Sequence, residues 1–388
     1  MDFENGLSGK LRKLADKGVE IIDPRQTYIS ADVDTDRIYS GSVLYPGTRL
    51  TGARTLIGTG AQIGMEGPAV IQDSIIGSGA EVASGFLSGA VMLQNSRAGA
   101  NSHYRAGTLL EEYASTAHAA GLKQTILMYS VTLGSLINFC DVLISGGRSR
   151  SEHSEVGSGF IHFNFAPWGK NGNKATPSLI GNVPDGVFLD SDRIFLGGLS
   201  GIAGPVSVGF GALTAAGQVI RESVPESTMH AEAGRSVDTE RKLSDYRLTE
   251  AHIQNIREKN VSFISELYAL QAWYSHIRLY RSRLLRDTEL ELVLTGAVDT
   301  IADCISERVQ RYNSFANEWS APVMQAIAPT DAAHFPEPSP DWKAELKHDE
   351  WVRQLSGQEK TSLRSWLESI VRLTGQRIIM AAGTPQAS

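Results

Sequence analysis

The sequence predicts a left-handed parallel β-helix of six-residue turns, followed by an α-helical C-terminal region. Mostly apolar residues recur every six positions, for example in the series Leu196, Ile202, Val208, Thr214 and Ile220. The first four of these are each followed by glycine or alanine. Glycine and small polar residues are concentrated before about residue 235, and helix-forming residues dominate after it.

A step of six residues fits neither the helical period of about 3.6 nor the alternation of a single strand. A coil of three short strands explains it, because one aliphatic side chain per face points inward and stacks on its counterpart one coil away. The small residue that follows lets the chain turn a tight corner. The run Val70, Ile76, Val82 and the pair Ile57, Ile63 keep the same step.

The chain divides into five expected segments. Residues 1–17 are expected to form an N-terminal helix, 18–235 the β-helix domain, 236–327 a long-helix domain, 328–341 a proline-rich linker, and 342–388 the C-terminal helices and tail. Apolar residues at three- and four-residue steps predict helices over about 248–286 and 290–319, and shorter ones over 342–355 and 360–373. The arginines of the first long helix are expected on its solvated face: Arg278, Arg281, Arg283 and Arg286.

Composition narrows the class of protein. The 388 residues are 41% hydrophobic, which is enough for a large core, and the net charge of −7 gives no basic surface for nucleic acid or an anionic membrane. Cys140 and Cys304 are too few for a disulfide framework and lack the spacing of a zinc site. The few cysteines fit a reducing cytoplasm and no bound metal, and the charge favours a small-molecule partner. Because no apolar stretch reaches about 18 residues, we expect a protein that does not cross a membrane.

Three segments, 18–29, 105–123 and 156–216, resemble the C-terminal domain of the bifunctional bacterial N-acetylglucosamine-1-phosphate uridyltransferase/glucosamine-1-phosphate acetyltransferase. The resemblance covers about half of the chain. It implies a homotrimer that transfers acetyl from acetyl-CoA, or another acyl-CoA, to an amino sugar phosphate at sites between subunits. The family's nucleotidyltransferase half has no counterpart in this sequence, so we expect no uridyltransferase activity.

The resemblance implies four substrate-binding residues. Arg105, in Arg-Ala-Gly, matches the family's phosphate-binding arginine, and Lys123 follows at the family's interval of eighteen residues and matches its second phosphate-binding cation. Arginine supplies a bidentate fork and lysine a point charge for such a phosphate. Lys174 matches a lysine that contacts the sugar, and Asn164 matches an asparagine of the family's site. His162 is expected to be a stacked, hydrogen-bonded histidine of the core.

Four further residues are implied for the cofactor. Ser158, Ser191 and Ala216 fall where the family lines its acetyl-CoA groove. Arg235 lies near the position of the arginine that binds the cofactor phosphates in the family. The alternative for the first three is structural, because the corners of a β-helix are rich in serine and alanine.

The sequence departs from the family at both of its catalytic residues. The family's general base is a histidine, and Ser135 stands at its position. The family's active-site glutamate falls on Gly121. A serine cannot take up the proton of an amine near neutral pH, so either acetyl transfer is lost or another residue supplies the base.

An insertion over residues 146–154 is a candidate source of new binding groups. Loops on a rigid scaffold often carry function, and Arg148, Arg150 and His153 could together hold a phosphate or pyrophosphate, with His153 as the base. The alternative is a solvated loop. His118, five residues before Lys123, is the second candidate base, and its alternative is an ordinary corner residue.

Three functions remain open from the sequence. The first is an acyltransferase-like enzyme that acts on a phosphorylated sugar or a nucleotide sugar. The second is a non-catalytic binding or scaffold protein that retains the sugar-phosphate site, has lost the acetyltransferase base, and binds a partner through its helical tail. The third is a rigid spacer without a small-molecule site, which leaves the spacing of Arg105, Lys123 and Lys174 unexplained.

Overall fold

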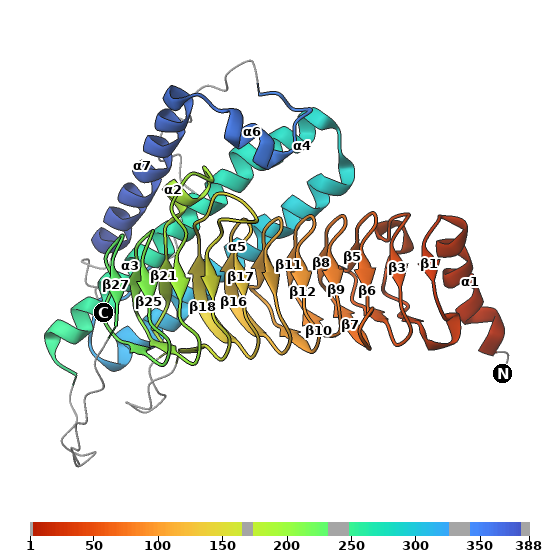
Figure 1. Ribbon diagram of the computed structural model, residues 1–388, viewed down its shortest axis with the longest axis horizontal. Coiled ribbons are helices and arrows are strands. Elements are labelled where there is room, and N and C mark those ends of the chain that lie inside the picture. The colour runs from red at the N-terminus through yellow and green to blue at the C-terminus, as the bar shows by residue number, and fades with distance from the viewer. Residues whose placement is uncertain (1–2, 165–173, 232–247, 326–341, 382–388) are drawn as a thin grey trace, which may run out of the picture.

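The chain folds into a long parallel β-helix with a group of helices packed along one side (Figure 1). The computed structural model describes residues 3–164, 174–231, 248–325 and 342–381. The strands stack coil upon coil, and the long helices follow them in the chain. The predicted fold class, a left-handed parallel β-helix followed by an α-helical region, is confirmed.

Each coil has three faces, which the chain visits in a fixed order. An 11-stranded parallel sheet forms the first face. Its strands are β1 (Glu20–Ile21), β3 (Val43–Leu44), β6 (Gln62–Ile63), β9 (Glu81–Val82), β12 (Arg97–Ala98), β15 (Ser115–Thr116), β17 (Thr132–Leu133), β19 (Glu155–Val156), β22 (Phe195–Leu196), β25 (Leu213–Thr214) and β27 (Met229–His230).

The second and third faces join into one 16-stranded sheet, because β16 (Gly121–Leu127) and β18 (Asn138–Ile144) each run around the corner between them. The other strands of the second face are β2 (Tyr28–Ile29), β4 (Arg49–Thr51), β7 (Ala69–Gln72), β10 (Gly85–Ser88), β13 (Ser102–Tyr104), β20 (Ile161–Phe163), β23 (Gly201–Ala203) and β26 (Val219–Ile220). Those of the third face are β5 (Leu56–Ile57), β8 (Ile75–Ile76), β11 (Val91–Met92), β14 (Leu109–Leu110), β21 (Ser178–Ile180) and β24 (Ser207–Val208).

The interior of the coil is a stack of aliphatic side chains. Ile63 pairs with Val82 one coil further on, and both are fully buried. Ile57 and Ile76 form the same kind of pair on the third face. Most of the predicted six-residue positions therefore do point inward, which removes their apolar surface from water.

One position of the predicted series is wrong by a single residue. Val70 is only partly buried, whereas its neighbour Ile71 is fully buried and pairs with Leu50 and Leu87 inside the coil. The chain turns the next corner at Asp73, which has a φ of 46°. The step from Ile71 to the next inward residue is therefore five, because this corner is one residue shorter than the repeat requires.

The third face differs from the other two because it is apolar on both sides. Ile75, Val91 and Leu109 point outward from it and are buried in a core that they share with the helices. Their neighbours Ile76 and Met92 point inward into the core of the coil. A face with two apolar residues in succession is therefore the face that the helices cover.

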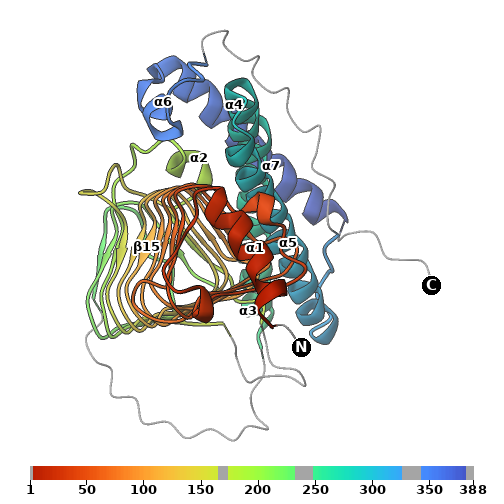
Figure 2. The same ribbon diagram turned by 90° about the vertical axis from the view of Figure 1, so that its right-hand side faces the viewer.

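The helices begin with α1 (Phe3–Asp16), which lies across the N-terminal end of the coil (Figure 2). Short turns η1 (Pro24–Gln26) and η2 (Thr35–Arg37) follow in the first coil, and α2 (Val183–Gly186) lies between β21 and β22. After the β-helix come α3 (Glu250–Ala272), the π-helix η4 (Trp273–Arg278), α4 (Leu279–Leu285), α5 (Thr288–Glu318), α6 (His348–Gln354) and α7 (Gly357–Ala381).

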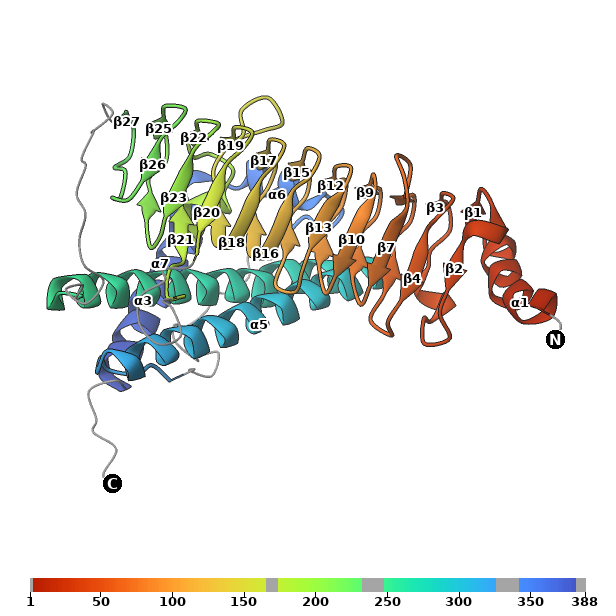
Figure 3. The ribbon, with the colours of Figure 1, turned by 90° about the horizontal axis from the view of Figure 1, so that it is seen from below.

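Helices α3 and α5 run alongside the β-helix (Figure 3), and α7 packs on α3. A Cβ atom on Gly296 of α5 would lie 2.1 Å from Cδ1 of Ile75, so the helix approaches the third face closely. The predicted helices over 248–286 and 290–319 are found, but a π-helical turn interrupts the first. Helix α6 is shorter than predicted and α7 is longer.

Two residues of the π-helical turn, Tyr274 and Arg278, make buried polar contacts with the coil. The guanidinium of Arg278 pairs with Glu111 and Glu112, and Tyr274 donates a hydrogen bond of 2.9 Å to Glu111. Arg278 and Arg281 are each 3% exposed, so the expectation that these two lie on a solvated face is wrong. They are buried because their partners lie on other elements, which a helical pattern cannot reveal.

The expected proline-rich linker and the tail after residue 381 lie outside the described residues. In the part of the chain that the structure describes, none of the helices has the length and apolar character needed to cross a membrane.

Candidate functional site

The predicted site residues divide among the three corners of the β-helix. We name the corner between the second and third faces, which contains Arg105, Lys123 and Asn164, the α5 corner. The open corner, between the first and second faces, contains residues 117–119, 134–136 and 157–159. The loop corner, between the third and first faces, contains residues 111–114, 145–154 and 181–193.

Arg105 and Lys123 are neighbours on successive coils of the α5 corner. Arg105 directly follows β13, whose Tyr104 pairs with Leu122 of β16. Adjacent strands are about 4.8 Å apart, so the two cationic side chains leave the corner side by side. Nη2 of Arg105 lies 3.6 Å from Sγ of Cys140, which is two coils beyond Arg105 and pairs with Lys123. The resemblance predicted such a pair, and the fold brings it together.

Helix α5 adds a stripe of polar side chains to this corner. Cys304, Glu307, Arg308 and Arg311 recur at three- and four-residue steps, so they share one face of the helix. The thiol of Cys304 donates to the carbonyl oxygen of Gly107 at 3.3 Å, which places this face against the corner.

Glu307 of α5 lies between two cations. Nζ of Lys123 is 3.2 Å from its Oε1, and Nε of Arg311 donates to the same oxygen at 2.7 Å. Burial by itself raises the pKa of Glu307, but the hydrogen bonds and charges of Arg311 and Lys123 outweigh that effect and lower its pKa. The carboxylate is therefore ionised near neutral pH.

A second, deeper set of contacts lies behind this pair. Nη1 of Arg308 is 3.7 Å from Oδ1 of Asp141, and its Nη2 donates to the backbone oxygen of Lys174 at 2.8 Å. Nδ2 of Asn164 donates to Asp141 at 3.4 Å. The predicted residues Asn164 and Lys174 thus lie at the same corner as Arg105 and Lys123.

Two nitrogens of Arg308, Nε and Nη1, have no hydrogen-bond partner among the described residues, although the side chain is 2% exposed. An unsatisfied buried donor costs free energy, so such a group favours an added acceptor. Among the described residues of this corner, cationic side chains outnumber anionic ones: Arg105, Lys123, Arg308 and Arg311 face Asp141 and Glu307. An anionic ligand fits this electrostatic surplus.

Burial keeps Cys140 and His162 of this corner uncharged. Burial raises the pKa of the Cys140 thiol, with a further contribution from Asp141, so a thiol rather than a thiolate faces Arg105. His162 is buried behind the corner, where its Nε2 is 2.8 Å from Oγ of Ser178, and desolvation lowers its pKa to about 4. The prediction of a hydrogen-bonded core histidine is confirmed.

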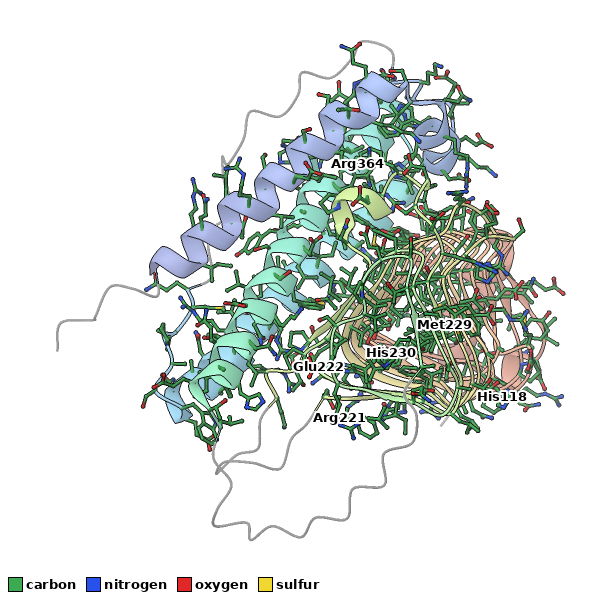
Figure 4. All side chains as sticks on the ribbon, turned by 60° about the vertical axis from the view of Figure 1, so that its left-hand side comes forward. His118, Arg221, Glu222, Met229, His230 and Arg364 are labelled. Atoms are coloured by element: carbon green, nitrogen blue, oxygen red, sulfur yellow. The ribbon has the colours of Figure 1, made fainter. Side chains whose placement is uncertain are left out.

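The open corner brings together the position of the family's base and a histidine. Oγ of Ser135 lies 3.0 Å from Nδ1 of His118, which belongs to the preceding coil. The backbone N–H of Ser135 donates to Oγ of Ser158 at 3.1 Å. His118 and Ser158 are exposed, and Ser135 is half-buried. Figure 4 shows His118 on an edge of the β-helix away from α3, α5 and α7.

The other predicted cofactor residues are not all at this corner. Ala216 is exposed at the open corner, two coils beyond Ser158. Ser191 lies at the loop corner, on the opposite edge of the first face. Arg235 lies outside the described residues. It follows the last strand of the first face, β27, whose residues Met229 and His230 lie at the C-terminal end of the coil (Figure 4).

The insertion at the loop corner makes contacts in three directions. Nη2 of Arg148 pairs with Asp192 at 2.6 Å, and Nη1 of Arg150 donates to the carbonyl of Tyr113 at 2.9 Å. Nδ1 of His153 is 2.8 Å from the carbonyl oxygen of Arg150 within the loop. The three side chains thus point to separate partners in this conformation, and their joint hold on a phosphate stays a prediction.

A cavity of about 600 Å³ lies beside this insertion. Its charged lining residues are of both signs, Arg148, Arg193, Glu152 and Asp192, and its apolar lining includes Phe195 and Leu213. The described residues contain no group of three or more His, Cys, Asp or Glu side chains that could hold a metal ion.

Sequence reasoning missed the residues that α5 supplies: Glu307, Arg308 and Arg311. Their helical spacing was visible, but nothing in it told which surface the helix covers. The signal that could have located α5 lies in the coil itself, in pairs such as Ile75–Ile76 and Leu109–Leu110, where both sides of the third face are apolar.

Comparison with curated proteins gives similarity over more than half of the chain's length. The bifunctional protein GlmU of Nocardia farcinica is 30% identical over 230 residues, which are 59% of this chain and 41% of the relative. The protein of the same name from Mycolicibacterium vanbaalenii is 33% identical over 218 residues, 56% and 39% of the two chains. That of Shouchella clausii is 29% identical over 222 residues, 57% and 43%.

The chain spans about two fifths of the length of these relatives. No protein-family model matches the sequence. The similarity and the stacked coils agree with the resemblance found in the sequence: over more than half of its length, the chain is similar to the bifunctional GlmU proteins, in keeping with their C-terminal hexapeptide-repeat domain.

Proposed function

We propose that the chain is a cytoplasmic acyltransferase-like protein that binds the phosphate of a phosphorylated sugar or nucleotide sugar at the α5 corner. The observation that carries this proposal is the convergence of Arg105 and Lys123 with Arg308 and Arg311 at one corner of the coil. The unsatisfied nitrogens of Arg308 add support, because they favour an acceptor that the described residues do not supply.

His118 is our candidate for the base. In acyl transfer the substrate amine attacks the thioester carbonyl of an acyl-CoA, the new C–N bond replaces the C–S bond, and the thiolate leaves. The amine proton passes to the base, and a neutral imidazole can accept it near neutral pH. If Nδ1 of His118 donates to Ser135, its Nε2 is the basic nitrogen.

Within one chain, the proposed phosphate position and the candidate base lie at opposite edges of the second face. Five residues separate His118 from Lys123, and an extended chain advances about 3.3 Å per residue, so they lie up to about 16 Å apart along the second face. We therefore propose that the site combines the α5 corner of one copy with the open corner of another, as in a homotrimer. Exposed apolar side chains on this side of the coil support a contact between copies: Leu136, Ile161, Phe163 and Leu199.

The test is an assay of acyl transfer from acetyl-CoA to a panel of amino sugar phosphates. The release of the free thiol of CoA measures the turnover. Loss of a general base costs about 10² to 10⁴ in rate, so His118→Ala is expected to lose most of the turnover. His153→Ala tests the competing base of the insertion. His252→Ala, an exposed histidine at the start of α3, is the matched control and should leave turnover unchanged.

The second candidate function is a non-catalytic sugar-phosphate-binding protein, and the replacement of the family's base by Ser135 favours it. Calorimetric titration separates the two functions. Binding of a sugar phosphate together with an acyl-CoA supports the enzyme, whereas sugar-phosphate binding without acyl-CoA binding supports the second function. A phosphate affinity that Lys123→Ala leaves unchanged would contradict both.

A further inference from the structure

The α5 corner contains an anion of its own. The carboxylate of Glu307 pairs with Lys123, one of the two cations that the resemblance assigns to phosphate, and with Arg311. Glu307 and Arg311 lie on α5, beyond the three segments that carry the resemblance. A ligand phosphate at Lys123 and the Glu307 carboxylate would use the same ammonium protons, which makes them competitors.

We propose that Glu307 is a tethered counter-anion that fills the phosphate position at Lys123 until a ligand replaces it, and that Arg311 then contacts the ligand phosphate. This inference rests on the proposed sugar-phosphate site. It assigns to α5 two residues that set the ligand affinity of a site built mainly by the coil.

The corner holds a fixed ion pair and an exchangeable one. Arg308 and Asp141 are 2% and 7% exposed, and separating them would leave a buried charge unpaired. Lys123, Glu307 and Arg311 are 27%, 24% and 20% exposed, so water can reach and solvate each partner when the pair opens. The Glu307 pair is therefore the one that a ligand can replace, while Arg308 stays in position.

Charge decides which ligands replace the carboxylate. When a singly charged ligand replaces the Glu307 carboxylate, the charge between the two cations is unchanged. The exchange therefore gains little electrostatic free energy. A phosphate monoester carries close to two negative charges above its second pKa of about 6, and gains more from the same cations. A tethered group competes at an effective concentration in the millimolar range, so weakly bound monoanions are kept out of the site.

The experiment is calorimetric titration of the full-length protein with inorganic phosphate at pH 8, with acetate as the monoanion. The Glu307→Gln variant keeps the size and hydrogen-bonding oxygen of the side chain but loses its charge. Because a partly exposed ion pair is weak, we expect phosphate affinity to rise by about 5-fold to 10-fold in this variant. Acetate binding should become measurable only in Glu307→Gln.

Glu291→Gln is the matched control. Glu291 lies on the same helix and forms an ion pair with Arg283 away from the corner, so its loss should leave phosphate affinity unchanged. The role of Arg311 is tested by comparing Glu307→Gln/Arg311→Gln with Glu307→Gln. If Arg311 contacts the phosphate, the double variant binds phosphate at least 3-fold more weakly.

The outcomes separate this inference from the proposed function. If Lys123→Ala abolishes phosphate binding but Glu307→Gln leaves the affinity unchanged or lowers it, the counter-anion is overturned and the site stands. If Lys123→Ala has no effect on phosphate binding, both are overturned. The thermal midpoint of each variant is measured first, and Lys123→Met replaces Lys123→Ala if the latter does not fold.

Discussion

The third face of the β-helix is covered by helices, whereas the second face carries its outward side chains in the open. Leu109, pointing outward from the third face, is fully buried under the helices, while His103 on the second face of the same coil is exposed. Both faces have the same backbone pairing, so the difference comes from the outward side chains alone. The coil thus specifies where the helical region docks.

The same contrast appears in the candidate site. At the α5 corner, helix α5 supplies Glu307, which pairs with Lys123 and with Arg311. At the open corner, the half-buried Ser135 contacts His118, which remains exposed. The covered corner can hold a ligand within one chain, and the open corner needs a further surface to enclose a reaction.

The largest expected effect comes from removing an outward side chain of the covered face. Leu109→Ala should lower the free energy of unfolding by about 2 to 5 kcal/mol, because it leaves a cavity between coil and helices. His103→Ala, its neighbour on the open face, should change it by less than about 0.5 kcal/mol. Urea titration measures both. Equal effects at the two positions would show that the helices do not depend on the third face.

Tryptophan fluorescence reports on the helical cover in this experiment. The tryptophans of the helical region are Trp273, Trp319, Trp342, Trp351 and Trp366. We expect their emission to shift at a lower urea concentration in Leu109→Ala than in the wild type. Circular dichroism of the strands should follow the same transition if the coil and the helices unfold together.

The second-largest effect is a pH dependence of the free energy of unfolding, caused by Glu266 in the helices that cover the third face. Glu266 of α3 accepts a hydrogen bond of 2.8 Å from the backbone of Val183, and burial raises its pKa to about 7. Between about pH 4.5 and 7 the unfolded state has released this proton while the folded state retains it. Stability therefore falls as pH rises through this window, by about 3 kcal/mol from this group.

Glu266→Gln cannot titrate, so this loss should be absent from it. The difference in unfolding free energy between wild type and variant should change by about 3 kcal/mol between pH 4.5 and 8, in favour of the variant at the higher pH. Because other buried groups titrate identically in both proteins, they cancel in the difference. A difference that stays constant with pH would contradict the raised pKa.

The smallest effect is expected at the open corner. Leu199 has a φ of 49° and is 82% exposed, and Leu136 has a φ of 59° and is 61% exposed. A leucine in the left-handed region costs about 1 kcal/mol, and asparagine tolerates it better. Leu199→Asn should therefore stabilise the fold by up to about 1 kcal/mol. If these leucines join copies of the chain, it should also weaken self-association, which light scattering measures.

The sequence determined the β-helix because its signal is local and repeated. Inward residues stack on partners about one coil away in the chain, as Ile57 does on Ile76 and Ile63 on Val82. One coil is about three six-residue steps, so the repeat in the sequence predicts these contacts. The cations Arg105 and Lys123 were predicted from the resemblance, and their interval of eighteen residues places them on successive coils. Val70 shows the limit: a corner shorter by one residue moved the inward position to Ile71.

Only the tertiary structure decided what α5 does at the site. Glu307 lies 184 residues from Lys123 in the chain, and no period connects them. Arg278 and Arg281 had the spacing of a solvated face and are buried, because acceptors on the coil and on the segment after residue 341 pair with them. A helical pattern determines which residues share a face, but the partner of a charged face depends on packing between distant elements.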